Sequence, residues 1–249
     1  MPRVKRTNRR RGGVARRRRA IPRAPRLLDG FTIVRRQPPS YIANSAISGV
    51  AQVSNPASGS GLNMIVLGTP VAHPIFTNTY SVPFAAAFTL DMLSQYLDLT
   101  GISDQYKISN VELRFQYNAS DVAGIASNNT NQPTFLPMLK YVIDYDDGSV
   151  ETPTQLQAKM GLRSKALSGG KQHSVRFSPR VADAVYATSL TTGYAVPARP
   201  MFLDSQTANI PHYGIKGYLE NFSLGSTSGG MTSCITIDVI YTVKLKGLQ

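Results

Sequence analysis

Hydrophobic and polar residues alternate with a period of two along several stretches of the chain, most clearly over residues 111–117 and 235–245. Such alternation is typical of a β-strand that buries one face and exposes the other. In the first stretch the apolar positions are Val111, Leu113, Phe115 and Tyr117. In the second they are Ile235, Ile237, Val239, Tyr241, Val243 and Leu245, with Thr236, Asp238, Thr242 and Lys244 on the other face. Both stretches are predicted to be strands.

Weaker versions of the same pattern predict further strands. Residues 138–145 alternate less cleanly, with Leu139, Tyr141, Ile143 and Tyr145 on one face. The other candidates are 31–36, 41–53, 62–68, 172–177, 184–190 and 212–219. Clusters of Gly, Pro, Asn and Ser separate them, which is typical of turns and loops. The chain is therefore expected to contain about eight or nine strands.

Helical pattern is scarce. Residues 91–99 and 152–160 each predict a few helical turns, and in the second stretch Thr152 is a candidate cap before Pro153. A chain dominated by strands with long connections favours two packed antiparallel sheets. The fold class predicted is all-β: a single jelly-roll β-sandwich of about eight antiparallel strands, preferred over a shorter immunoglobulin-like domain.

Charge divides the chain into two unlike parts. Twelve of the 27 Lys and Arg residues lie within residues 1–26, where there is no Asp or Glu. The residues after 26 include the other 15 basic residues and all 14 acidic residues, so their formal net charge is +1. The basic residues of the first part are Arg3, Lys5, Arg6, Arg9, Arg10, Arg11, Arg16, Arg17, Arg18, Arg19, Arg23 and Arg26. A near-neutral body therefore carries a polycationic N-terminal arm.

The arm has too little apolar surface to fold alone, and its like charges repel, so it is expected to be disordered. Such an arm has three possible roles: a solvated tail or nuclear-import signal, attraction to a membrane, and binding of nucleic acid. Eleven of its twelve cations are Arg, whose planar guanidinium forks onto phosphates and stacks on bases. Apolar residues at helical spacing, which a membrane-surface helix needs, are missing. Nucleic-acid binding is the interpretation favoured, and it is compatible with an import signal.

Composition places limits on the body. A single cysteine, Cys234, excludes a framework of disulfides within the chain. No run of residues approaches the length of a membrane span, so no membrane insertion is expected. The three histidines, His73, His173 and His212, are far apart in sequence and show no metal-ligand or triad spacing. We therefore predict no catalytic residue, no cofactor and no enzymatic activity.

One acidic cluster is a candidate metal site. Asp144, Asp146 and Asp147 precede Gly148, but their spacing misses the calcium-loop pattern by one residue. An Asp-Gly turn, with its carboxylates solvated or paired with an Arg of a neighbouring molecule, is the favoured interpretation. The three aspartates remain weak candidates, and the prediction is that no metal binds.

Four stretches resemble the capsid proteins of circular single-stranded DNA viruses that encode a replication initiator, the circovirus- and cyclovirus-like group. They are DQYKISNVELRFQ (104–116), YVIDYDD (141–147), VRFSPRVADAVY (175–186) and IPHYGIKGYL (210–219), in the order of the family. Many relatives place a Trp ahead of the last stretch, whereas this chain contains none and has MFLDSQ at 201–206. The chain is therefore not assigned to a genus.

The resemblance implies a viral capsid protein that self-assembles, about 60 copies at a time, into a small icosahedral (T=1) shell. Residues 1–36 would be the disordered nucleic-acid-binding arm with its nuclear-import signal, and 37–249 the jelly-roll shell domain. The expected partners are copies of the chain, viral single-stranded DNA and host nuclear import receptors, while the sequence does not identify a cell-surface receptor. The expected locations are the virion and, during assembly, the host nucleus.

The charge of the arms sets the scale of packaging. About 60 copies with twelve charges each would neutralise roughly 700 phosphates. Two alternatives remain open at this point. One is a nucleic-acid-binding shuttle or movement protein that builds no shell, and the other is the capsid of a small RNA virus, because phosphate contacts barely distinguish DNA from RNA.

Overall fold

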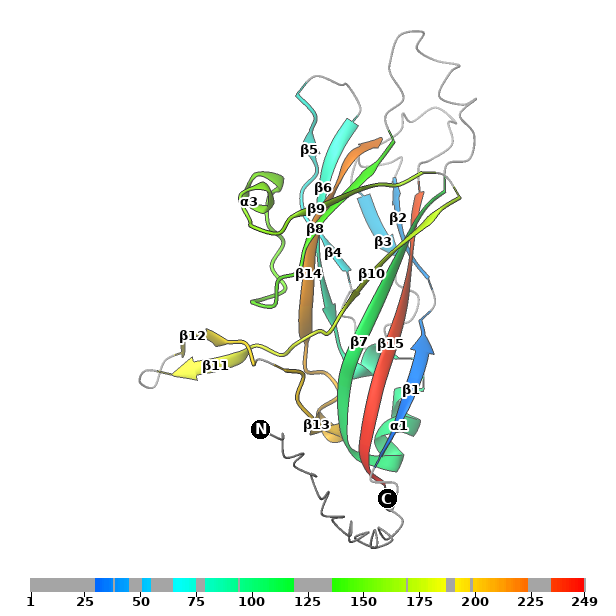
Figure 1. Ribbon diagram of the computed structural model, residues 1–249, viewed down its shortest axis with the longest axis vertical. Helices are drawn as coiled ribbons and strands as arrows, with labels where there is room; N and C mark the ends of the chain where they lie inside the picture. Colours follow the sequence, from blue (N-terminus) through cyan, green and yellow to red (C-terminus); the bar gives the residue numbers. More distant parts are fainter. Residues whose placement is uncertain are drawn as a thin grey trace, which may run out of the picture.

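The computed structural model describes residues 30–37, 39–44, 51–54, 65–74, 79–93, 95–118, 136–168, 170–186, 191–197, 199–223 and 234–248. Strands dominate these residues and form two large antiparallel sheets (Figure 1).

The first sheet is built around the two longest strands, β7 (Ser103–Asn118) and β15 (Cys234–Leu248). Its order is β10-β7-β15-β2-β3, with β1 also paired to β15 and β13 also paired to β7. The other members are β1 (Gly30–Arg36), β2 (Ser40–Asn44), β3 (Ala51–Ser54), β10 (Gln172–Phe177) and β13 (Leu203–Asp204).

The second sheet has the order β4-β6-β14-β8-β9, with β5 also paired to β6. Its strands are β4 (Ile65–Leu67), β5 (Val71–Ala72), β6 (Thr79–Phe88), β8 (Met138–Val142), β9 (Arg163–Ala166) and β14 (His212–Ser223).

The strand order defines a jelly roll. Counting β1 and β2 together as the first principal strand, the others follow in chain order as β6, β7, β8, β9, β10, β14 and β15. The first sheet then has the order first, eighth, third, sixth, and the second sheet has the order second, seventh, fourth, fifth. This arrangement of eight strands in two facing sheets is the jelly roll, and the predicted fold class is confirmed.

The core lies between the two sheets and contains aromatic pairs that join one sheet to the other. Phe84 of β6 packs against Phe115 of β7, with 6.1 Å between ring centroids. Phe88 of β6 contacts both Phe177 of β10, at 5.6 Å, and Tyr241 of β15, at 5.9 Å. Offset and edge-on pairs of this kind add to the stabilisation from burial itself. One strand of the second sheet thus contacts three strands of the first.

The predicted faces of the two clearest strands are confirmed. The apolar positions of 111–117 and 235–245 are all buried, and Val239 lies opposite Leu113 in the ladder. The ladder shifts register near Thr242, where Ser109 donates a hydrogen bond to the Thr242 carbonyl. Such a bulge changes which residues face inward. It explains why the buried apolar residues of β7 are even-numbered before the bulge, at Tyr106 and Ile108, and odd-numbered after it.

Most weaker strand predictions correspond to observed strands with different ends. Residues 172–177 are β10, and 212–219 lie within the longer β14. The candidate 138–145 ends early, because β8 stops at Val142. Residues 41–53 contain two strands, β2 and β3, and 62–68 contains β4. The candidate 184–190 overlaps β11 (Asp183–Tyr186), which pairs with β12 (Thr191–Ala195), and residues 187–190 lie outside the described residues.

The candidate strand 31–36 corresponds to β1, and this changes the predicted boundary of the arm. Gly30–Arg36 pairs with Lys246–Ile240 of β15 in an unbroken ladder. Phe31 and Ile33 pack against the core. Residues 30–36 therefore belong to the sheet and not to the arm, whose predicted end at residue 36 lies too far along the chain. Their alternating apolar side chains pack on the core and hold this segment on the sheet. Residues 1–29 lie outside the described residues.

The helices are short. Residues 91–99 are predicted to form a few helical turns, and the structure has a 3-10 turn there, η1 (Leu90–Met92), followed by α1 (Tyr96–Ile102). The second helix prediction is confirmed in part by α3 (Pro153–Gln157), in which Thr152 forms a capping box with Gln155. A further 3-10 turn, η2 (Ser205–Thr207), follows β13. Among the described residues, none of these helices has the length and apolarity to cross a bilayer.

Candidate functional site

The four stretches that carry the family resemblance meet one another in the fold. Asp144 and Asp147, in the loop after β8, lie beside Lys216 of β14. On the first sheet, Glu112 of β7 pairs with Arg176 of β10 at 2.8 Å. Ion pairs thus join residues that are distant in sequence, and each cluster of charges is a candidate site.

The largest cluster covers the outer face of the second sheet, opposite the core. The segment that follows β8, including α3, folds over this face, where Leu156 packs with Val142 and Tyr218. Gln157 of α3 donates a hydrogen bond of 2.9 Å to the Tyr218 hydroxyl. This cover encloses Lys216, whose side chain is only 2% exposed.

Lys216 and Lys159 share three carboxylates. The Lys216 ammonium lies 2.5 Å from Asp147, 2.9 Å from Glu151 and 3.8 Å from Asp144. The Lys159 ammonium lies 2.6 Å from Glu151 and also pairs with Asp144. We call these five residues the lysine cluster. Three carboxylates against two ammonium groups leave a net charge of −1.

The cluster stabilises the charged forms of its members. Burial alone would raise the pKa of Asp144, but its hydrogen bond from Lys159 and the charge of Lys216 bring that pKa below its ordinary value. Burial likewise opposes the charge of Lys216, yet hydrogen bonds to Asp147 and Glu151 raise its pKa above the ordinary value. The groups are therefore all ionised near neutral pH, as a compensated buried cluster requires.

Two of the three aspartates that are weak metal candidates belong to the lysine cluster. Asp144 and Asp147 are engaged by Lys159 and Lys216 of their own chain. Asp146 is exposed, and its backbone N–H donates to the Asp144 carboxylate at 3.1 Å, as in an Asx turn. Within the described ranges there is no group of three or more His, Cys, Asp or Glu side chains placed to hold a metal ion.

Replacing Lys216 with Ala is expected to destabilise the body strongly. It would leave three carboxylates facing one ammonium group, and breaking a buried ion pair costs about 3 kcal/mol or more. For a body of this size, that corresponds to a fall of about 6–12 °C in unfolding temperature. Lys140→Ala is the matched control, because the Lys140–Glu220 pair lies on the same sheet but is about one-fifth exposed. Equal unfolding temperatures for the two variants would contradict this role.

The loss of stability caused by Lys216→Ala should depend on pH. Carboxyl groups whose folded pKa is lowered stabilise the protein above their unfolded pKa, and this stabilisation is lost as the pH falls through the folded pKa. The pKa values of Asp144, Asp147 and Glu151 are all lowered. The difference between wild type and Lys216→Ala should therefore be full at pH 7 and shrink below about pH 4.

A second junction joins three of the resemblance stretches. Arg180 and Tyr213 exchange two backbone hydrogen bonds, at 2.9 and 2.7 Å. The Arg180 guanidinium lies 4.4 Å from the centroid of the Tyr145 ring, a cation–π contact. A Cβ on Gly214 would lie 2.5 Å from the Phe177 ring, so only glycine fits there. The role of this junction within the fold is packing.

The histidines lie in separate parts of the structure. His212 is buried, and its Nδ1 lies 3.0 Å from the Ile210 carbonyl and 3.2 Å from the Phe88 carbonyl. Burial lowers its pKa to about 4, so it is neutral at pH 7 and donates to these carbonyls. His173 packs against Tyr141, and burial also lowers its pKa. His212 thus joins the end of β6 to the start of β14 and has a structural role.

The outer face of the first sheet carries mixed charge. Glu112 accepts hydrogen bonds from Arg114 and Arg176, and these, opposed by burial, lower its pKa. Asp238 pairs with Arg36 at 2.6 Å. Farther along the same two long strands, this face carries Lys107, Lys244 and Lys246 (residues of β7 and β15). Positive charge therefore dominates this face toward the end where β1 begins.

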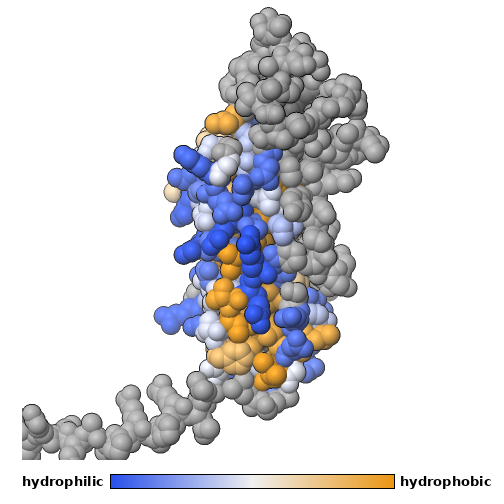
Figure 2. Space-filling model, turned by 90° about the vertical axis from the view of Figure 1, so that its right-hand side faces the viewer, coloured by the Kyte–Doolittle hydropathy of each residue, from blue (hydrophilic) through white to orange (hydrophobic). Residues whose placement is uncertain are grey.

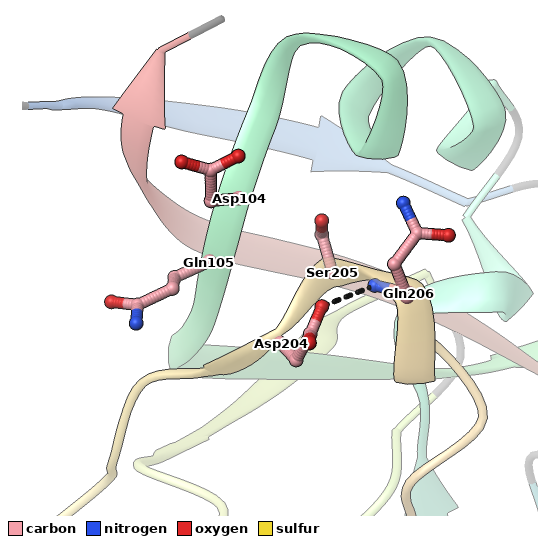
Figure 3. Close-up of a pocket in the computed structure, with 5 residues that line it drawn as sticks. All are labelled: Asp104, Gln105, Asp204, Ser205 and Gln206. Atoms are coloured by element: carbon pink, nitrogen blue, oxygen red, sulfur yellow. Dashed lines mark hydrogen bonds between the residues drawn. The ribbon is translucent and has the colours of Figure 1, made fainter.

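A small acidic hollow lies next to those lysines. It has a volume of about 310 Å³ and is lined by Asp104, Gln105, Asp204, Ser205 and Gln206 (Figure 3). The Asp204 carboxylate accepts a hydrogen bond of 2.9 Å from the Gln206 backbone and caps η2. Two carboxylates would repel phosphate, so this hollow is not suited to nucleic acid.

Sequence reasoning missed the lysine cluster. Glu151, Lys159 and Lys216 were not singled out, because their partners are distant in sequence. The one available signal was a lysine in the middle of the predicted strand 212–219. The twelve basic residues of the arm lie outside the described residues, and their role stays a prediction.

Comparisons with known proteins find similarity in structure only. No family model matches the sequence, and no curated protein matches it. The structure is similar to the 60-mer BFDV capsid protein, with 9% identity, a TM-score of 0.49, and coverage of 88% of this chain and 95% of that one. It also resembles chains of mud crab tombus-like virus (10% identity, TM-score 0.36, coverage 100% and 94%) and of tobacco necrosis virus (10%, 0.35, 88% and 97%). The structural neighbours are thus viral proteins.

Proposed function

We propose that this chain is the capsid protein of a circular single-stranded DNA virus of the circovirus-like kind. About 60 copies of the jelly-roll body would form a small icosahedral shell, and the arms would package the genome inside it. The observation that carries the proposal is the division of charge: a jelly-roll body with a balance of +1 behind an arm of +12. A near-neutral body approaches its copies without strong repulsion, while the arm neutralises phosphate.

The place where the arm joins the body supports this arrangement. Gly30, the first residue of β1, pairs with Lys246 near the end of β15. Every copy would therefore release its arm at the same end of the first sheet, so a symmetric shell would gather all arms on one side. That side would be the interior if the arms package the genome.

Features of the surface fit contacts between copies. Strands β11 and β12 pair with each other and extend away from the sandwich (Figure 1). A two-stranded hairpin is only marginally stable alone, so a neighbouring copy would stabilise it. Exposed apolar side chains include Val34, Leu97 and Ile102, and Figure 2 shows hydrophobic residues gathered on the lower part of the face that it views. We propose these as subunit contacts.

Nuclear import is a further part of the proposal. The Arg clusters of the arm would be bound by host import receptors before assembly, which would bring the protein to the host nucleus. Packaged RNA is the alternative, since phosphate contacts serve both nucleic acids.

The test is assembly of the purified full-length chain. We expect closed particles of roughly 200 Å by negative-stain electron microscopy, with a ratio of absorbance at 260 and 280 nm raised by nucleic acid; the size follows from about 60 symmetric copies. Assembly should depend on protein concentration, because the contacts are many and weak. Digestion with nucleases specific for DNA or RNA identifies the cargo. A monomer across all salt and pH conditions would refute the shell.

A further inference from the structure

The surface beside the start of β1 combines an exposed aromatic ring with three lysines. Phe202, just before β13, is 38% exposed. The Lys107 ammonium lies 4.6 Å from the centroid of its ring, and the Lys246 ammonium lies 5.8 Å from it. Lys244 lies directly opposite Lys107 in the ladder, two residues before Lys246 on β15. We call Phe202, Lys107, Lys244 and Lys246 the Phe202 patch.

The fold brings these residues together from three elements. Leu203 of β13 pairs with Tyr106 of β7, which sets Phe202 beside Lys107. Lys244 and Lys246 belong to β15, which pairs with β7 on one side and with β1 on the other. The patch is therefore anchored on regular strands.

The arrangement is unfavourable for the free protein. Like charges directly opposite each other across two strands destabilise a sheet, and Lys107 faces Lys244 in this way. In the described part of the chain, the ion pairs within 4 Å do not include these three lysines. Their contacts with the Phe202 ring offset only part of that repulsion. A bound anion would relieve it.

A hollow at the patch has room for a planar ring. Its volume is about 250 Å³, and it is lined by Gly30, Phe31, Thr32, Phe202, Lys244, Leu245 and Lys246. For scale, an apolar cavity of about 150 Å³ in another protein holds benzene. Aromatic side chains that stack bases, next to cations that contact phosphates, are the common elements of sites for single-stranded nucleic acid.

The position of the patch points to the same ligand as the arm. Gly30 lines the hollow, and Arg26 stands four residues earlier in the sequence, so the two Cα atoms are at most about 15 Å apart. The acidic hollow with Asp104 and Asp204 borders the patch on the side of η2. A phosphate backbone would therefore approach from the β1 side, where the arm begins.

We infer that the Phe202 patch is a second nucleic-acid contact, on the folded body, that stacks one base of a single strand on Phe202 and binds its phosphates with Lys107, Lys244 and Lys246. The inference rests on the proposed function, because its ligand is the nucleic acid that the arm packages. It adds a contact point on the folded body to the contacts that the arm would make. Stacking tolerates any base, so the contact would not select a sequence.

The test uses the full chain with single-stranded oligonucleotides of dT and rU of equal length, below the concentration of assembly. Phe202→Ala should weaken binding about 5- to 100-fold, in line with the loss of one stacked base, and leave the salt dependence unchanged. Replacing the three lysines with Gln should reduce the slope of log K against log salt by about 2. Met201→Ala is the control, since Met201 is the adjacent residue, equally exposed and not aromatic.

A position-specific measurement separates this inference from the proposed function. Oligonucleotides carrying 5-iodouracil should photo-cross-link to the peptide that contains Phe202, as located by mass spectrometry, and Phe202→Leu should remove that cross-link while retaining the fold. Stronger binding of rU than dT would identify RNA as the preferred strand. Unchanged affinity and no cross-link at this peptide, with the arm still binding, would overturn the inference alone. Loss of all nucleic-acid binding by the wild type would overturn the proposed function.

Discussion

Val239→Asp is expected to abolish soluble folding. Val239 is fully buried in β15, opposite Leu113 of β7, at the centre of the longest strand pair. An aspartate there would either bury an unpaired charge or be held protonated, and either outcome costs several kcal/mol. The total stability of a domain is only about 5–15 kcal/mol. We therefore expect the variant to accumulate in the insoluble fraction and to show no cooperative thermal transition.

Thr242→Asp is the matched control for that experiment. Thr242 lies on the same strand three residues later, on the outer face of the first sheet, and is partly exposed. A charge at this position stays in contact with water, so the expected change in the free energy of unfolding is about 1 kcal/mol or less. Similar unfolding of the two variants would mean that the two faces of β15 are wrongly assigned.

The sequence predicted the strands that bury one face and expose the other. The alternation in 235–245 and 111–117 follows directly from a core on one side and water on the other, so the pattern could be seen without a structure. The Thr152 cap was likewise visible, because its partner Gln155 lies three residues away. Features that depend on near neighbours in sequence were thus predictable.

The strand β6 could not be predicted in this way. In its segment TYSVPFAAAF, polar and apolar residues do not alternate, because side chains on both faces of the strand are buried. Pro83 also argues against a central strand. In the structure the Pro83 carbonyl accepts a hydrogen bond from Gly68. The nitrogen and carbonyl of a strand residue point to the same side, so the missing N–H faces the break between β4 and β5. Pro83 therefore accepts a bond from Gly68 but cannot donate one in return, and β4 ends one residue earlier, at Leu67.

The lysine cluster and the Phe202 patch could not be predicted from the sequence for another reason. Lys216 and Asp147 are 69 residues apart, and Phe202 and Lys107 are 95 apart, so only the strand order brings each pair together. A balance of +1 over the body also hid the local excess of lysines around Phe202. Net charge describes the body as a whole and not the distribution of charge on one sheet.

Deleting residues 2–26 is expected to leave the jelly roll folded and to remove most nucleic-acid binding. The segment supplies all twelve cations of the arm and ends before β1 begins at Gly30. Thermal unfolding of the deleted form should match that of the full chain. Replacing all eleven arm Arg residues with Lys is the charge-preserving control, which should bind with a similar salt dependence and somewhat lower affinity, because forked and stacked contacts are lost.

The measurement that tests the account most directly is the salt dependence of single-stranded DNA binding by the full chain and by the form lacking residues 2–26. Counterion release predicts a slope of log K against log salt of about −0.7 for each phosphate contacted, which gives about −8 for twelve arm cations. Between 50 and 200 mM salt the arm alone should account for a loss of about 10⁵-fold in the affinity of the full chain. The deleted form should bind weakly, with a slope of about −2 or shallower from the Phe202 patch. A comparable slope in both forms would place the main binding surface on the folded body and contradict the division of roles between body and arm.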